Sequence, residues 1–336
     1  MGTGALETAG PISLESVLTA IFENSDNPSA FLAANSGNSH FTHPAAPGVI
    51  AYRTVGRHLV QFGGPFAPVA HRAELLRRFG EFASASGRRV VAVQLQSSDT
   101  DTYAAAGYTV NQLGASYAVD LAEFTLRGSR FVKLRNKISR AHRSGLTVTE
   151  VAQESLRSEM AELDEVWLTS KGKHAKPLEF LVGEYGGAAQ RHRRLFAGTI
   201  DGRLAGYISY SPAHGSRPGW LHDLSRRHPD GPPGVMEAIN HAALEAFRAE
   251  GTRWLHFGFT PFTGLSPELE VPGASRWFRW LVHQLWTRGD SVYPARTQLA
   301  YKTKWAPHAV LPEYVAFSGG ASLTGFLRVF KAANAL

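Results

Sequence analysis

The sequence contains no cysteine in its 336 residues. This absence excludes disulfide bonds, thiolate zinc sites and cysteine nucleophiles, and it is consistent with a reducing compartment. The 14 histidines do not replace these ligands, because none lies in an HExxH or similarly spaced motif. We therefore expect no metal site.

Long apolar runs are also absent. A membrane-spanning helix needs roughly 18 continuous apolar residues, and no stretch approaches that length. Residues 1–11 are small and polar, without the basic and apolar order of a secretion signal. The predicted location is therefore the cytoplasm. The remaining composition, 43% hydrophobic and 19% charged, is that of a globular protein, and the length suggests about two domains.

Acidic residues are missing from one segment near the middle of the chain, between Glu123 and Glu150. That segment holds as many positive charges as the formal net charge of +7, namely Arg127, Arg130, Lys133, Arg135, Lys137, Arg140 and Arg143. From Phe131 to Ser144 the apolar and basic residues fall on separate helical stripes, and Gly145 follows as a cap. Because no acidic residue compensates these charges, we favour an anion-binding role for this helix over that of an ordinary solvent-exposed face.

The segments on either side of this basic helix share an order of elements. Before it we expect strands at 48–52, 58–62, 89–95 and 116–121 and helices at 70–83 and 99–106. After it we expect helices at 154–170, 234–250 and 275–287 and strands at 194–200, 204–211, 218–224, 253–259 and 298–305. A hairpin followed by strand–helix–strand crossovers predicts an α/β fold whose mixed sheets have a parallel portion.

The first candidate site follows the predicted strand 218–224. Asp223 lies near the end of this strand, Arg226 and Arg227 begin a Pro/Gly loop, and the next helix starts at Gly234. Two arginines beside a helix N-terminus are typical of a phosphate site. The alternative is a polar loop whose arginines pair with Asp230 or Asp223.

The second candidate site is a lysine-rich segment near the C-terminus. If residues 298–305 form a strand, Lys302 and Lys304 share one face while Tyr301 lies on the other. A third cation, Lys171, lies at a helix end, where the helix dipole alone explains it. The chain has no phosphate-loop, dinucleotide-binding or nucleophile-elbow motif.

Several motifs, taken in order, resemble one known family. They are Phe131–Val148, Trp167–Gly172, His222–Glu237, Phe257–Leu265, Tyr301–Pro307 and the pair Glu313-Tyr314. Across residues 45–318 this order is similar to that of the C-terminal catalytic domain of phosphatidylglycerol lysyltransferases, the multiple peptide resistance factor family.

The resemblance implies a tandem GNAT-like fold, with two mixed sheets flanked by helices and linked by the basic helix. The implied domains are residues 1–128, the linker helix 129–146 and a catalytic domain at 147–336. The donor in this family is aminoacyl-tRNA, so no other cofactor is expected. The family's Asp-Leu-x-Arg motif matches Asp223 and Arg226, and its motif lysine matches Lys302.

Two departures bear on the acceptor. Full-length members carry a multi-helix membrane domain that this chain does not have. Residues 293–298 also lack the aromatic-polar-Gly-Leu pattern that we expect in lipid-modifying members. The sequence prediction is therefore an enzyme that transfers an amino acid to an amine or hydroxyl of a small molecule, as in natural-product pathways. The alternative acceptor is phosphatidylglycerol or another lipid, reached through peripheral contact with an anionic membrane.

Two further alternatives stay open. A CoA-dependent N-acyltransferase is disfavoured because Pro229, Pro232 and Pro233 cannot donate backbone N–H groups to a pyrophosphate. A degenerate, non-catalytic pair of GNAT domains would only bind RNA.

The predicted roles follow from aminoacyl ester chemistry. Lys302 stabilises the oxyanion, Asp223 orients or deprotonates the acceptor, and Arg226 with Arg227 holds a phosphate. The predicted substrate-binding set also contains Lys304, Glu237, Lys171 and Tyr301. The predicted tRNA contacts are Lys133, Arg135, Lys137, Arg140 and Arg143.

Overall fold

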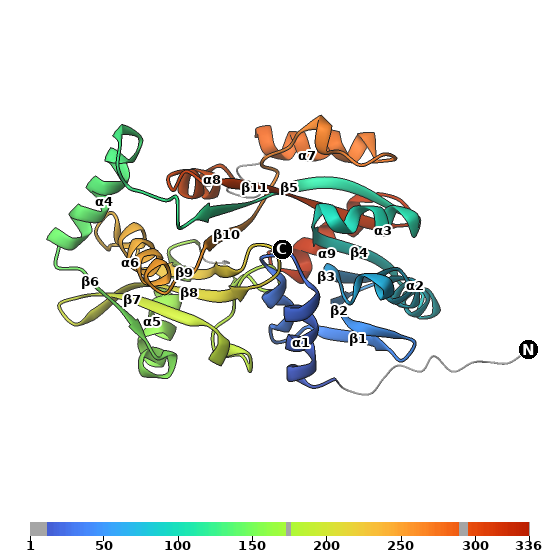
Figure 1. Ribbon diagram of the computed structural model, residues 1–336, viewed down its shortest axis with the longest axis horizontal. Coiled ribbons are helices and arrows are strands. Elements are labelled where there is room, and N and C mark those ends of the chain that lie inside the picture. The colour runs from blue at the N-terminus through green and yellow to red at the C-terminus, as the bar shows by residue number, and fades with distance from the viewer. Residues whose placement is uncertain (1–11, 173–175, 289–294, 336) are drawn as a thin grey trace, which may run out of the picture.

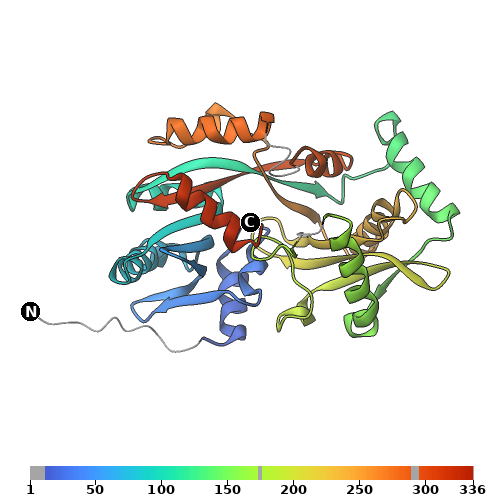
Figure 2. The same cartoon turned by 180° about the vertical axis from the view of Figure 1, so that it is seen from behind.

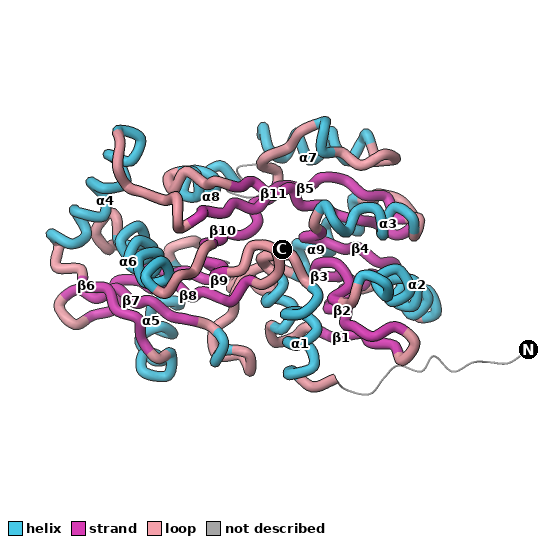
Figure 3. The backbone as a smooth tube through the Cα atoms, in the orientation of Figure 1, coloured by secondary structure: helices cyan, strands magenta, loops and turns pink. Residues whose placement is uncertain are grey.

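The computed structural model describes residues 12–172, 176–288 and 295–335 (Figure 1). In these residues eleven strands form one mixed sheet, in the order β1-β2-β3-β4-β11-β5-β10-β9-β8-β7-β6 (Figure 3). The strands are β1 (Ser39–His43), β2 (Ala46–Val55), β3 (His58–Phe66), β4 (Arg89–Leu95), β5 (Tyr108–Asp120), β6 (Thr147–Val151), β7 (Arg194–Ile200), β8 (Arg203–Ala213), β9 (Gly219–Arg227), β10 (Trp254–Pro261) and β11 (Ala309–Ser318). The helices are α1 (Leu14–Asn24), α2 (Val69–Ala85), α3 (Thr100–Ala105), α4 (Val132–Arg143), α5 (Arg157–Thr169), α6 (Val235–Ala249), α7 (Arg276–Arg288), α8 (Ala295–Thr303) and α9 (Leu323–Ala332).

The predicted α/β class is confirmed, but the two expected sheets are one. The long strand β5 pairs with β11 on one side and with β10 on the other, so its hydrogen bonds run without a break between the two halves. Strand β11 comes from the C-terminal segment and lies between β4 and β5 of the first half. The proposed domain limits at 128 and 146 stay a prediction. Because β11 lies between β4 and β5, the C-terminal segment packs into the core of the first half of the chain.

Helices cover both faces of the sheet because adjacent residues of each strand point to opposite sides. On β3, Leu59 packs against α2 while Val60 packs in the core with α9. On β8, Ile208 packs with α4 and α6 while Tyr207 packs with α5. Figure 2, seen from behind, shows α5 and α9 in front of the sheet. Every residue of β3 is buried.

Most of the predicted helices are confirmed. The basic segment forms α4, and the expected helices at 154–170, 234–250 and 275–287 correspond to α5, α6 and α7. The sequence did not predict α1, β1, β6, α8, β11 or α9. None of the helices within the described residues has the length and hydropathy to cross a bilayer.

The prediction of a strand at 298–305 is wrong, because this segment forms the end of helix α8 and the turn after it. Ala, Leu, Gln, Arg and Lys fill most of α8, and all of them favour helix. In a helix, residues two apart lie on roughly opposite sides, so Lys302 and Lys304 do not share a face. The segment 293–298, which lacks the pattern expected of lipid-modifying members, is only partly described. Residues 293 and 294 lie outside the described residues, and Ala295 begins α8.

Two strand ends were also predicted too early. Strand β3 runs through Gly63 and Pro65 to Phe66. Strand β9 runs past Leu224, because Arg226 and Arg227 pair with Tyr207 and Gly206 of β8. The arginines therefore lie on a strand rather than in the expected loop.

Helices α4 and α6 meet at Gly234, the N-cap of α6. This glycine has φ +98°, and a Cβ there would lie 2.0 Å from the carbonyl oxygen of Lys137 in α4. The position therefore requires glycine for both its backbone conformation and its close contact with α4.

We predict that Gly234→Ala lowers the free energy of unfolding by roughly 2–4 kcal/mol, through backbone strain and steric clash. Chemical denaturation measures this loss. The matched control is Gly251→Ala at the other end of α6, where φ is +80° but no atom lies within 4 Å of the new methyl group. It is expected to cost about 1 kcal/mol. Equal losses in the two variants would contradict the close contact between α4 and α6.

Candidate active site

A pocket opens where two parallel strands separate. Strands β9 and β10 pair only from Gly219–Leu221 to Trp254–His256. On its other side, β10 shifts register against β5 between His256 and Phe259, where Gly258 has φ +65°. The hydrogen-bond ladders that β10 forms with β9 and with β5 are therefore both interrupted just after His256, and the ends of β9 and β10 diverge.

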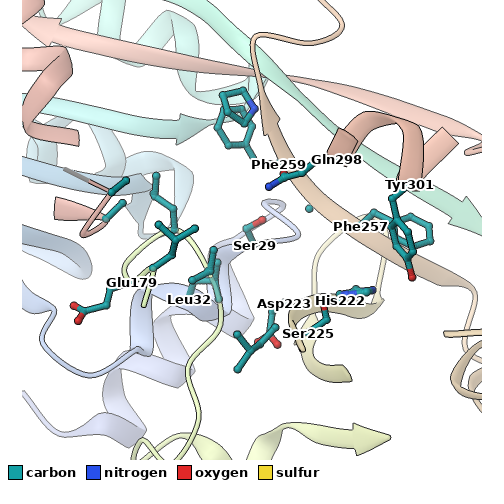
Figure 4. Close-up of a pocket in the computed structure, with 18 of the residues that line it drawn as sticks. Ser29, Leu32, Glu179, His222, Asp223, Ser225, Phe257, Phe259, Gln298 and Tyr301 are labelled. Atoms are coloured by element: carbon teal, nitrogen blue, oxygen red, sulfur yellow. The ribbon is translucent and has the colours of Figure 1, made fainter. Parts of the chain in front are cut away.

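The pocket has a volume of about 570 Å³ (Figure 4). Strands β9 and β10, helices α5, α8 and α9, and the loop from residue 178 to 182 contribute to its walls. Much of the lining is apolar, including Leu32, Leu181, Met236, Phe257, Phe326 and Val329. The predicted residues Asp223, Arg226, Lys302, Lys171 and Tyr301 also line it.

Lys302 lies at the interruption in β10. Its Nζ donates to the carbonyl oxygens of Gly258 at 2.7 Å and Phe259 at 2.9 Å. The residue is only 7% exposed. Burial lowers the pKa of Lys302 from 10.5 to about 7. Lys302 is therefore a hydrogen-bond donor in a fixed position, and its amino group gains and loses a proton near neutral pH.

A buried acid lies behind this lysine. Glu313 of β11 is fully buried, and the hydroxyl of Ser116 donates to its Oε1. Burial raises the pKa of Glu313 to about 7, while the positive charge of Lys302 opposes that rise. Its Oε2 has no hydrogen-bond partner among the described residues. The ionised form of Glu313 thus raises the pKa of Lys302 through its charge, without a direct hydrogen bond to it.

The carboxylate of Asp223 is enclosed by protein and does not face the pocket. Its Oδ2 lies 3.0 Å from Nε of Arg193, and both side chains are fully buried. A Cβ at Gly183 would lie 2.5 Å from the Asp223 carboxyl carbon, so the loop at Gly183 covers the group. Burial raises the pKa of Asp223 and the Arg193 charge opposes the shift. The geometry therefore favours a positioning role over direct contact with an acceptor.

The Asp223–Arg193 pair extends into the first half of the chain. Arg193 Nη2 donates to Asn35 Oδ1 at 2.5 Å, and its guanidinium lies 4.9 Å from the ring centre of Phe31. Asn35 Nδ2 donates in turn to the carbonyl of Val182, which lines the pocket. This buried chain of contacts fixes the end of β9 relative to the first half.

Trp167 brings two cations together at the pocket wall. The guanidinium of Arg226 lies 4.2 Å from the ring centre of Trp167, and Nζ of Lys171 lies 5.1 Å from it. Arg226 Nε is 3.6 Å from Oδ1 of Asp164 in α5, an aspartate other than the two named in the predicted alternative. Stacking on an indole fixes each cation while leaving N–H groups for an anion.

His222 is a pocket residue that the motif contains but the sequence did not single out. Its Nδ1 lies 3.3 Å from Asn240 Oδ1, which also accepts the Tyr210 hydroxyl proton. Burial lowers the pKa of His222 to about 4, so the ring is neutral at neutral pH. A proton on Nδ1, directed at Asn240, leaves Nε2 as an acceptor.

Glu237 and Lys304 lie outside the pocket. Glu237 Oε1 binds Nζ of Lys304 at 3.0 Å and Nζ of Lys137 at 3.1 Å. This acid thus joins α4, α6 and the end of α8. The carbonyl of Lys137 also lies close to Gly234 at the N-terminus of α6. The phosphate site predicted beside the arginines at this helix end stays a prediction.

The other predicted cations divide into free and engaged groups. Arg135 donates to the carbonyls of Leu126 and Gly128, which orders the turn before α4. Arg227 is exposed at the end of β9. On α4, Lys133, Arg140 and Arg143 are exposed, and this face is separate from the pocket lining.

The site also contains residues that no sequence motif indicated. Arg193 and Asn35 are 158 positions apart, and neither has a signature at its own position. Glu313 was part of the resemblance without a role. Among the described residues, no group of three or more histidines and acids could hold a metal ion.

Residues 19–317 match a family described as phosphatidylglycerol lysyltransferase, C-terminal. The MprF-like domain protein Rv1619 of Mycobacterium tuberculosis is 26% identical over 262 residues, which cover 75% of this chain and 54% of that protein. The phosphatidylglycerol lysyltransferase of Bacillus subtilis is 23% identical over 280 residues, which cover 82% of this chain and 32% of that protein. This chain therefore spans about half and about a third of those two relatives.

Solved structures with this fold include the C-terminal domain of a putative lysylphosphatidylglycerol synthetase from Agrobacterium fabrum. It aligns with a TM-score of 0.79 and 21% identity, covering 96% of this chain and 98% of that one. L-PGS from Bacillus licheniformis aligns with a TM-score of 0.77 and 20% identity, covering 97% of both chains. At these identities the likeness supports the fold.

We predict that Arg193→Met and Asp223→Asn each lower the free energy of unfolding by roughly 3–5 kcal/mol, because each leaves a buried charged partner uncompensated. The double variant is expected to lose less than the sum of the two, since it removes both charges. Urea denaturation of the four proteins measures the coupling. Arg191→Met is the control, because its pair with Glu15 is mostly exposed and its loss should not change stability measurably. Additive losses from Arg193 and Asp223 would contradict the pairing.

Proposed function

Because the chain belongs to the phosphatidylglycerol lysyltransferase C-terminal domain family, we propose that it transfers an aminoacyl group from aminoacyl-tRNA to phosphatidylglycerol. The family resemblance read from the motifs is confirmed. The comparisons do not support the small-molecule acceptor preferred from the sequence. They favour the lipid alternative, since one relative is named a phosphatidylglycerol lysyltransferase.

The composition of the pocket supports a lipid acceptor. Leucine and phenylalanine side chains form much of the wall, whereas Lys171, Arg226 and Lys302 supply positive charge. A phosphatidylglycerol molecule has the complementary order, with acyl chains, then a phosphate, then a terminal hydroxyl. In this arrangement Arg226 and Lys171 hold the phosphate, fixed by their stacking on Trp167.

The proposed reaction is attack of the lipid hydroxyl on the aminoacyl ester. A bond forms between the hydroxyl oxygen and the ester carbon, and the bond from that carbon to the tRNA ribose oxygen breaks. The ester is already activated, so the protein mainly orients the reactants and stabilises charge. Lys302 is fixed by two carbonyls, and its remaining N–H stabilises the oxyanion of the tetrahedral intermediate.

We assign the contact with the attacking hydroxyl to His222 in preference to Asp223. The Nε2 of a neutral His222 accepts a hydrogen bond from this hydroxyl, and the hydroxyl proton passes to the leaving ribose oxygen as the ester bond breaks, so protons balance over the cycle. Asp223 is enclosed beneath Gly183 and acts by fixing Arg193 and β9. This division of roles replaces the base that was predicted from the sequence.

The exposed cations of α4 supply a surface for the donor. Lys133, Arg140 and Arg143 present positive charge without an acidic residue on the same helix. Phosphate contacts of this kind position a nucleic acid regardless of its sequence. Lys137 and Arg135 support the helix through Glu237 and the preceding turn, so they act structurally in this proposal.

The proposed activity is tested with labelled aminoacyl-tRNA and vesicles that contain phosphatidylglycerol, followed by counting label in the lipid extract. Wild-type protein is expected to transfer label, and Lys302→Ala is expected to lower the rate about 10²- to 10³-fold through loss of oxyanion stabilisation. Arg203→Ala, at the exposed first residue of β8, is the control and should retain the wild-type rate.

Each failure has a distinct meaning. Unchanged transfer by Lys302→Ala would remove the lysine from the reaction. Label that reaches only water-soluble acceptors would overturn the lipid acceptor. Binding of tRNA with no transfer to any acceptor would favour the non-catalytic RNA-binding alternative.

A further inference from the structure

Helix α7 presents one face to the core and another to solvent. It lies along the upper edge of the molecule in Figure 1, above β5 and β11. Phe278 and Val282 are buried, and the Phe278 ring lies 5.1 Å from the rings of both Phe317 and Phe326. The inner face is thus anchored in the core that also lines the pocket.

The outer face of α7 carries two large indoles in solvent. Trp277 is 45% exposed and Trp280 is 62% exposed. The exposed residues around them on the same helix are basic or polar: Arg276, Arg279, His283, Thr287 and Arg288. Tryptophan exposed to this extent is unfavourable in water unless another surface covers it.

Helix α7 itself contains no acidic residue. No acidic residue occurs in the sequence between Glu270 and Asp290. Glu270 is turned inward, where its Oε2 lies 3.4 Å from both Asn111 Nδ2 and the Gln112 backbone N–H. Arg296 of α8 donates to the Thr287 carbonyl at 2.8 Å and lies over the Trp286 ring, which ties α8 to the end of α7.

We infer that the outer face of α7 docks onto an anionic lipid surface. Tryptophan side chains are favoured at the headgroup level of a bilayer, and arginines beside them bind lipid phosphates. The basic helix α4 has exposed cations but no tryptophan, which suits a nucleic acid backbone. Helix α7 therefore combines cations with exposed tryptophans, which suits a lipid surface, whereas α4 has exposed cations without tryptophan, which suits RNA.

The position of α7 gives this docking a consequence for the pocket. Phe278 contacts Phe326, whose side chain belongs to the pocket lining, and α8, the next helix along the chain, carries Lys302. A bilayer held against the outer face of α7 is thus separated from the pocket by the helix itself and by the side chains that its inner face contacts. The docking requires no transfer, so its test is separate from that of the proposed function.

The test is co-sedimentation of the full chain with vesicles of equimolar phosphatidylglycerol and phosphatidylcholine, compared with vesicles of phosphatidylcholine alone. We expect at least about tenfold tighter binding to the anionic vesicles. Trp277→Ser with Trp280→Ser, and separately Arg276→Ser with Arg279→Ser, should each weaken that binding at least about tenfold. Circular dichroism and thermal melting confirm that these exposed substitutions leave the fold intact.

The matched control is Arg140→Ser with Arg143→Ser on α4, which removes the same charge from a helix without tryptophan. It should bind anionic vesicles as the wild type does. The inference is overturned if the tryptophan variant sediments like the wild type, if binding depends on α4 instead, or if the wild type ignores phosphatidylglycerol. It is also overturned if the tryptophan substitutions only convert a dimer to a monomer, since a second copy would then be the partner of α7.

Discussion

The separation of β9 from β10 is the constraint on which the candidate site depends. Once the two strands stop pairing at Leu221 and His256, the carbonyls of β10 beyond His256 have no partner in β9. A buried unpaired carbonyl is costly, and Lys302 removes that cost by donating to two of them. The same separation creates the volume that a substrate would fill. The pocket and the position of the Lys302 ammonium group therefore both depend on the separation of β9 from β10.

Buried charged and polar groups hold the separated strands in place. Asp223 and Arg193 form a buried ion pair that holds the end of β9 against Asn35 of the first half. Such a pair stabilises little by itself, but losing either partner is expensive. Glu313 of β11, a strand that the C-terminal segment contributes to the first half, acts on Lys302 through its charge without a hydrogen bond to it. The continuous sheet and these contacts make the two halves one unit around the pocket.

The sequence predicted features that depend on neighbouring residues better than features that depend on distant ones. Helix α4 was predicted because its stripes and its lack of acids are local. Residues 298–305 were misread as a strand because alternation over a few residues does not distinguish a strand from helix α8. The pocket position of Arg226 and Lys302 followed from motif order. The enclosure of Asp223 did not, because Arg193 and Gly183 reach it only through the tertiary fold.

The most direct test of this account is the pKa of Lys302 itself, measured by NMR titration of its Cε methylene group and assigned through the signal lost in Lys302→Arg. Burial beneath the two β10 carbonyls predicts a pKa of about 7, which Glu313 prevents from falling further. A pKa near the ordinary 10.5 would contradict the account. It would mean that the ammonium group is in water and that the separated strands do not hold it.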